Sequence, residues 1–250
     1  MTPRTLLALG AAVLAFSAGA LAFDGTTGLG ADVAVAAETS HDAAPVHVTK
    51  AELRRVDSIE LDAEALVLRD GDDTVVESSM RDSGLTVSVL NRLLGTPSRT
   101  QTAEGDGGAC FPAGTTYTWG GAIRVAALTT DAAAGNAVEI RVLRDSVRSV
   151  LGRQIELTGP GGVRVGDDIA DEIADAPGSE RVSYGSDDSR AWQLLLREGW
   201  ADRHDDDDDD DDESSKHSDD AGTNGVSALT NETTVTVLGS PMPVHAQRSC

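Results

Sequence analysis

The apolar positions of this chain fall into short stretches separated by turn residues, and most of the stretches favour strands. Apolar and polar residues alternate in part over residues 59–68, and a glycine-containing turn at 70–73 leads into a second apolar stretch at 74–76. This order predicts a hairpin. Leucine and valine then recur every three or four positions over residues 85–94, and Gly95 follows. That spacing predicts an amphipathic helix that ends at the glycine.

Strand patterns return after the helix, and the order of elements then recurs. Two further strands with a small-residue loop between them are predicted, one over residues 117–125 and one at 138–143. A second series of hairpin, short helix, Gly/Pro stop and two strands follows. The second series is predicted at residues 154–165, 167–174, 181–184 and 191–196. A recurring order indicates an internal repeat. We therefore expect an α+β protein with two related subdomains, residues 56–150 and 151–250, each with a hairpin, a short helix and further antiparallel strands.

The N-terminal 22 residues have the pattern of an export signal. Arg4 provides a positive start, an uncharged run follows, and Ala20-Leu21-Ala22 has the form of a cleavage site. A second small-residue site ends at Ala37, and a retained leader would be long enough to anchor the chain in a membrane. Residues 23–55 lack sustained periodicity and predict a flexible linker. We expect a protein that is secreted or held in the cell envelope.

A low-complexity acidic stretch interrupts the second half. Residues 202–220 hold 12 acidic and two basic side chains, and strand patterns resume at 225–229 and 233–238. The stretch therefore predicts a disordered loop, residues 202–224, between two strands. Its candidate ligands for a divalent cation are Asp205, Asp206, Asp207, Asp208, Asp209, Asp210, Asp211 and Asp212. Such a run lacks the turn-forming glycines of ordered calcium loops, so a diffuse counterion cloud is the other interpretation.

The formal charge of the whole chain is −22, and only 3% of the residues are aromatic. Nucleic acid is excluded as a general partner, because gripping phosphates requires clustered cations. The scarcity of large rings predicts an aliphatic core whose anchors are Trp119, Trp192, Trp200, Tyr117, Tyr184 and Phe111. A surface for a partner is the alternative use of Tyr117, Trp119 and Trp192. All five histidines lie in the linker, the acidic loop or the C-terminal end, and no hydrolase or nucleotide-binding motif is present. We expect no catalysis and no cofactor.

The chain has two cysteines, Cys110 and Cys250. Neither has a cysteine or histidine neighbour at the spacing of a metal site. An oxidising compartment would favour a disulfide between them, with free thiols or a bond to another chain as the alternatives.

Three segments resemble secreted actinobacterial proteins of unknown function. They are residues 94–97, 110–120 and 238–250, within a similarity that covers residues 56–250. The order of helix, Leu-Gly-x-Pro stop and tryptophan-bearing strand is also similar to the tandem α/β units of β-lactamase-inhibitor-like and outer-membrane-assembly lipoprotein-like domains. That resemblance implies binding to other proteins.

Together these features predict an exported, non-catalytic protein-interaction module whose partner is another extracellular or envelope protein. The alternative function is a divalent-cation-binding or surface-charge protein that acts through residues 205–212.

Overall fold

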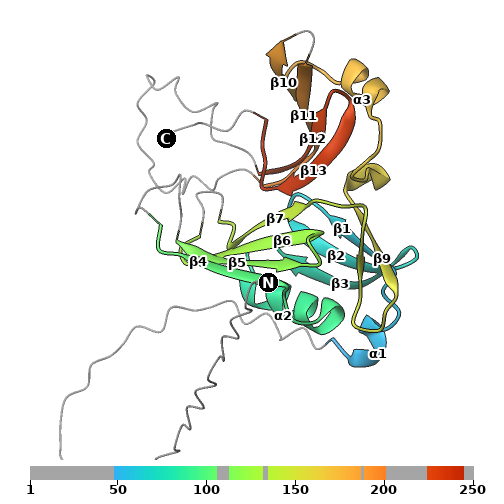
Figure 1. The fold of residues 1–250 in the computed structure, drawn as a ribbon, viewed down its shortest axis with the longest axis vertical. Coiled ribbons are helices and arrows are strands. Elements are labelled where there is room, and N and C mark those ends of the chain that lie inside the picture. Colours follow the sequence, from blue (N-terminus) through green and yellow to red (C-terminus); the bar gives the residue numbers. More distant parts are fainter. Residues whose placement is uncertain (1–47, 106–112, 132–134, 187–188, 201–223, 245–250) are drawn as a thin grey trace, which may run out of the picture. The chain divides into compact units, whose positions relative to one another are not determined.

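The chain forms two β-sheets and a few short helices in the residues that the structure describes. The structure is a computed structural model, and it describes residues 48–105, 113–131, 135–186, 189–200 and 224–244. Thirteen strands and three α-helices lie in these ranges. The protein is therefore α+β, as the sequence predicts, with strands in the majority (Figure 1).

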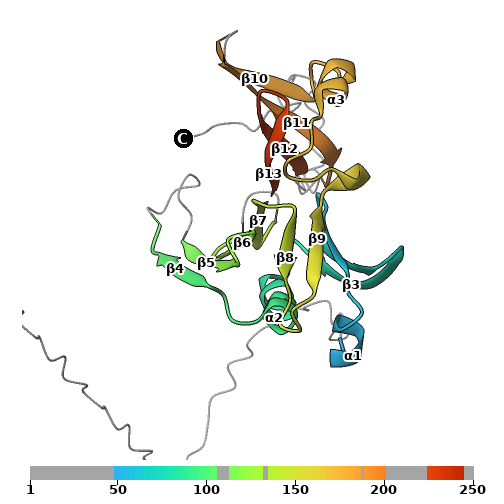
Figure 2. The same ribbon diagram turned by 45° about the vertical axis from the view of Figure 1, so that its right-hand side comes forward.

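The first sheet has five strands in the order β3-β2-β1-β9-β8. They are β1 (Ser58–Leu61), β2 (Ala65–Asp70), β3 (Asp73–Ser79), β8 (Ser146–Arg148) and β9 (Gln154–Thr158). Figure 2 shows β8 and β9 side by side. Neighbours run antiparallel except β1 and β9, which pair in parallel with Ile59 opposite Leu157. A parallel pair requires a long crossover. Here the crossover contains four strands of the other sheet.

The second sheet has eight strands in the order β10-β11-β12-β13-β7-β6-β5-β4, and every neighbouring pair is antiparallel. They are β4 (Arg99–Ala103), β5 (Gly114–Trp119), β6 (Ile123–Leu128), β7 (Val138–Val142), β10 (Arg181–Ser186), β11 (Ser189–Glu198), β12 (Gly225–Asn231) and β13 (Thr234–Ser240). In this sheet, the strands from the first 150 residues join those from the later part of the chain through the pairing of β7 with β13.

Each helix begins and ends at local sequence signals. Helix α2 (Ser83–Leu94) begins after Asp82, whose carboxylate accepts a hydrogen bond from the Leu85 amide at 2.8 Å. It ends at Gly95, whose φ of 87° suits glycine. The other elements are α1 (Lys50–Leu53), α3 (Ala170–Asp175) and a 3₁₀ turn η1 (Pro160–Gly162).

The core is aliphatic, as the composition predicts. Valine, leucine and isoleucine from both sheets and from α2 form one buried cluster, which Trp119 joins. Each fully buried leucine or isoleucine stabilises the fold by about 1.5–3 kcal/mol. The Trp119 indole donates a hydrogen bond to the Gly95 carbonyl at 2.9 Å, so its polar edge is satisfied. Tyr117 and Trp192 are half-buried and pack against the cluster. Trp119 is thus a core anchor, and Trp200 also packs against the cluster. Tyr184, expected as an anchor, is instead 40% exposed, and Phe111 lies outside the described residues.

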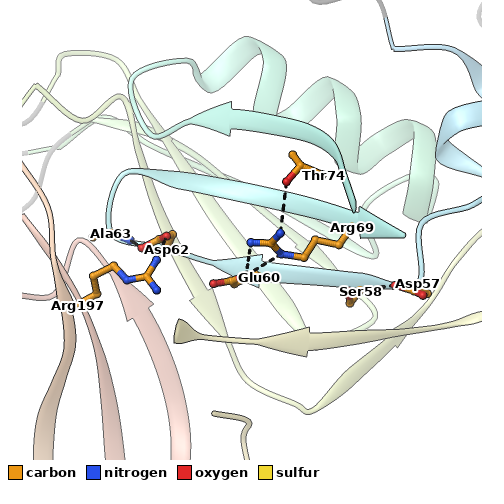
Figure 3. A network of polar contacts seen from close by, with 8 residues as sticks. All are labelled: Asp57, Ser58, Glu60, Asp62, Ala63, Arg69, Thr74 and Arg197. Atoms are coloured by element: carbon orange, nitrogen blue, oxygen red, sulfur yellow. Dashed lines mark hydrogen bonds and ion pairs between the residues drawn. The ribbon is translucent and has the colours of Figure 1, made fainter. Parts of the chain in front are cut away.

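Charged side chains pair where β1 meets its neighbours (Figure 3). The Arg69 guanidinium lies 2.7 Å from the Glu60 carboxylate and also donates to the Thr74 hydroxyl. At the end of β1, the Asp62 carboxylate pairs with Arg197 of β11, a strand of the second sheet. Each of these arginines therefore faces a carboxylate.

Several predicted elements are confirmed. The helix over residues 85–94 is α2, the helix over 167–174 is α3, and the strands at 181–184 and 191–196 are β10 and β11. The hairpin around residues 70–73 is β2 and β3. The predicted strand over 59–68 is two strands, because the chain turns at Asp62, whose carboxylate accepts a hydrogen bond from the Ala63 amide.

Three other predictions require correction, and the internal division is not confirmed. The predicted strand over 117–125 is two strands, β5 and β6, because the chain turns at Gly120 and Gly121. The hairpin at residues 154–165 is wrong, because β9 pairs with β1 and β8 while residues 163–165 form no strand. Helix α1 lies within the expected linker 23–55. The division at position 150 into two subdomains is not confirmed, because strands from both halves share each sheet and residues 46–250 form one compact unit.

Candidate binding site

A tight turn between β8 and β9 presents two apolar side chains to solvent. The Ser149 amide donates to the Arg153 carbonyl at 2.8 Å, and the Gly152 amide donates to the Ser149 carbonyl at 2.9 Å. Gly152 has a φ of 78°, a conformation that favours glycine. Val150 and Leu151 sit at the tip and are 58% and 52% exposed. A turn tip is normally polar, so two adjacent exposed aliphatic residues require an explanation.

This turn, the end of α2 and helix α1 surround a small pocket, which we call the basic pocket. Its lining residues are Lys50, Leu53, Arg54, Val56, Arg92, Leu93, Ser149, Val150, Leu151 and Arg153. The Val150 amide donates to the Leu93 carbonyl at 3.0 Å and so fixes the turn against α2. The hollow measures about 30 Å³, enough for one or two water-sized groups or the tip of an aliphatic side chain.

Four cations line the basic pocket, and no carboxylate among the described residues does. The four ion pairs in the described ranges use other arginines: Arg55, Arg69, Arg164 and Arg197. Arg92 donates to the Val48 carbonyl and Arg153 donates to the Arg54 carbonyl. A neutral carbonyl orients a guanidinium but leaves its positive charge uncompensated. The pocket is therefore a local positive region on a strongly acidic chain.

Helix α1 carries an acidic residue, Glu52, whose carboxylate is already engaged. It accepts hydrogen bonds from the Thr49 amide at 2.7 Å and from the Thr49 hydroxyl at 2.8 Å. The Thr49 backbone bond, followed by its hydroxyl bond and the charge of Arg55, holds the pKa of Glu52 below its usual value. This capping box orders α1 and positions Lys50 and Arg54 at the pocket.

One wall of the basic pocket holds an unsatisfied hydroxyl. Ser149 is 7% exposed, and its Oγ has no hydrogen-bond partner within the described part of the chain. Buried polar atoms in folded proteins almost always have a partner. This hydroxyl is available to a ligand that enters the pocket.

The site residues predicted from the sequence are not among those that the structure describes. Cys110, Cys250 and the run Asp205–Asp212 all lie outside the described residues, so the disulfide and the cation site remain predictions. All five histidines are outside these ranges too. Within them, no group of three or more His, Cys, Asp or Glu side chains could hold a metal ion.

The basic pocket is not predicted from the sequence, although the sequence contains two signals for it. Thr49 and Glu52 have the spacing of a capping box, which predicts a helix start within the supposed linker. Val150, Leu151 and Gly152 form an apolar turn, a pattern that polar loop sequences lack. Neither signal shows that α1, α2 and the turn meet.

Comparison with known proteins gives no relative for this chain: no family model, no curated protein and no solved structure matches it. Among the helices that the structure describes, none is long and apolar enough to cross a membrane. The chemistry of the site must therefore be argued from its own residues. An apolar hollow with four unneutralised cations suits an apolar group that carries negative charge beside it.

Proposed function

We propose that this protein is an exported, non-catalytic interaction module that binds an acidic segment of another extracellular or envelope protein at the basic pocket. The observation that carries the proposal is the coincidence of two features at one place. Val150 and Leu151 are exposed aliphatic side chains, and the cations around them have no carboxylate partner in the described part of the chain. A partner with one aliphatic side chain flanked by carboxylates would satisfy both features.

Burial and charge contribute differently to such binding. Covering an exposed leucine and valine removes apolar surface from water, at roughly 25 cal/mol per Å². The cations add attraction and orientation, and their effect is local because charges are screened over about 8 Å at physiological salt. A short acidic segment can therefore bind here although the formal charge of the whole chain is −22. An extended polyanion would meet repulsion from the rest of the surface.

A protein partner is favoured over nucleic acid or lipid on these grounds. Nucleic acid requires a broad array of cations along its phosphates. An anionic membrane presents a wide plane of negative charge, which an acidic protein approaches at a cost. The basic pocket offers four cations around a hollow of about 30 Å³, a scale that fits the tip of one aliphatic side chain with charged groups beside it.

The pocket can be tested with a defined probe, an acetylated Asp-Leu-Asp tripeptide amide, by NMR titration of the full exported chain. We expect shifts of amide signals in α1 and in the turn 149–153, with roughly millimolar affinity. A Lys-Leu-Lys probe should not bind. Leu151→Asp should abolish binding, whereas Tyr184→Asp, at an exposed large residue of β10, should not.

The biological partner requires a second experiment with the same variants. Pull-down from secreted and cell-wall fractions should recover a protein through the native chain and lose it with Leu151→Asp. The recovered protein should carry an acidic segment with an aliphatic residue. Equal recovery with Leu151→Asp, or preferential binding of the native chain to anionic vesicles or an oligonucleotide, would overturn the proposal.

The proposal is independent of the acidic run and of any internal repeat. A chain that lacks residues 204–220 should bind the tripeptide as the full chain does; loss of divalent-cation binding in that chain would instead support the alternative function. Related subdomains at 56–150 and 151–250 are not required, because the basic pocket combines residues from both halves.

Export itself is tested by the N-terminal sequence of the mature protein, which is expected to begin after Ala22 or Ala37.

A further inference from the structure

A second hollow runs along the exposed side of α2. It is an open groove of about 500 Å³, and we call it the α2 groove. Its lining residues are Ser83, Gly84, Val87, Ser88, Asn91 and Arg92 of the helix, with Tyr117 of β5 and Ala127 of β6. Arg92 also lines the basic pocket. The groove and the basic pocket therefore meet at one side chain.

Four polar side chains in the groove have no hydrogen bond to the rest of the described chain. They are those of Ser83, Ser88, Asn91 and Tyr117. Hydroxyl and amide groups can both donate and accept, so they match the alternating N–H and C=O groups of an extended peptide backbone. The groove thus offers bonds to a backbone, whereas the basic pocket offers contacts to an apolar side chain and to negative charge.

Gly84 supplies an independent argument that the groove is kept open. This glycine lies in the first turn of α2, its φ is in the ordinary range, and an added Cβ would approach only the Asp82 carboxylate, at 3.5 Å. The fold therefore does not require glycine at this position. Glycine disfavours a helix relative to alanine. Glycine at this position therefore leaves this end of the α2 groove open, where a larger side chain would fill it.

We infer that the basic pocket and the α2 groove together bind one continuous segment of the partner in an extended conformation. This inference rests on the proposed function and extends it. The aliphatic side chain occupies the basic pocket, an acidic residue beside it faces Arg92, and the following backbone lies along α2. From Ser83 to Arg92 the helix rises about 13–14 Å, which matches about four extended residues. The groove tolerates many side chains, and the pocket selects the anchor.

The test compares two probes on the full chain. The short probe is the Asp-Leu-Asp tripeptide amide; the long probes add four uncharged residues, Ser-Ala-Ser-Ala, at its N-terminal or its C-terminal side. We expect one long probe to bind about tenfold more tightly than the short one, with additional NMR shifts at Ser88 and Tyr117. The other long probe should bind like the short one, because the chain can leave the pocket toward α2 in only one direction.

Substitutions in the α2 groove then test whether the tenfold gain in affinity of the long probe comes from the groove. Gly84→Gln combined with Ser88→Gln fills the groove with good helix formers, so the fold should persist or become more stable. This double variant should lose the tenfold gain and keep the short probe's affinity. Ala174→Gln, at an exposed position of α3, is the matched control and should change neither.

The outcomes separate the two proposals. If the short probe binds and neither long probe gains affinity, the groove does not take part and this inference is overturned, while the proposed function stands. The same holds if the gain survives Gly84→Gln with Ser88→Gln. If no probe binds, both the inference and the proposed function fail.

Discussion

Two groups of cations in this protein are arranged in opposite ways. Around β1, Arg69 faces Glu60 and Arg197 faces Asp62, so each positive charge has a carboxylate (Figure 3). Around the basic pocket, Arg92 and Arg153 donate to backbone carbonyls. The chain has 42 acidic and 20 basic residues, so carboxylates are not scarce. Cations without a carboxylate partner among the described residues of such a chain support the proposal that another molecule completes this site.

The largest expected effect is on binding at the unpaired group. Arg54→Glu with Arg153→Glu reverses two charges of the basic pocket and should weaken the Asp-Leu-Asp probe about a hundredfold at low salt, or about 2.7 kcal/mol. Both side chains are exposed, so thermal unfolding should shift by only a few degrees. An NMR titration measures the affinity, and a thermal melting curve measures the stability. A large loss of stability with unchanged affinity would mean that these cations serve the fold.

The next effect is on stability at the paired group. Arg69→Met leaves the Glu60 carboxylate, 16% exposed, without its partner, and should lower the free energy of unfolding by about 1–2 kcal/mol. Binding of the probe should not change. Arg55→Met is the matched control, because its contact with Asp70 is 3.7 Å long and exposed; its cost should stay below about 0.5 kcal/mol. Urea unfolding of the two variants shows whether losing the partly buried ion pair costs more stability than losing the exposed one.

Added salt should weaken binding at the basic pocket more than it weakens the ion pair between Arg69 and Glu60. Raising sodium chloride from about 0.02 to about 0.5 M should weaken the Asp-Leu-Asp probe roughly fivefold, since exposed charges are screened. The free energy of unfolding of an Arg69→Met chain relative to the native chain should change much less, because the Arg69–Glu60 pair is partly buried. Affinity that is independent of salt would contradict an electrostatic role for the four cations.

The smallest expected effect is on how the stability of helix α1 depends on acidic pH. The folded-state pKa of Glu52 is lowered, chiefly by the Thr49 backbone hydrogen bond, so Glu52 stabilises the folded state above its ordinary pKa. This contribution is lost as the pH falls through the lowered pKa. NMR titration of the Glu52 carboxyl should show the lowered value, and Glu52→Gln should remove this part of the acid dependence. A normal pKa for Glu52 would show that the capping box does not form in solution.

Sequence patterns predict the elements whose signals are local. Helix α2 follows from the spacing of Val89, Leu90 and Leu93 and from the glycine after it. The hairpin of β2 and β3 follows from the turn around Gly71. The acidic start of α3 is equally local. These elements depend on neighbours within a few positions, so one sequence is enough to locate them.

The parts that were missed depend on distant partners or on a lack of burial. Strand β9 pairs with β1, which lies far earlier in the chain, and no local pattern shows a parallel pairing. Strand β4 is exposed along its whole length, so it lacks the alternation that reveals a half-buried strand. The basic pocket takes its residues from three separate segments. Only the three-dimensional fold shows that these segments meet.

The parallel pairing of β1 with β9 determines when the basic pocket forms during folding. Helix α1 precedes β1, and the apolar turn precedes β9, so closing this long loop is what joins the two walls of the basic pocket. Pairings across long loops form late and slowly, because chain entropy opposes them. A chain in which β1 and β9 have not yet paired thus lacks the proposed site, and a partner that requires both walls would bind only the folded protein.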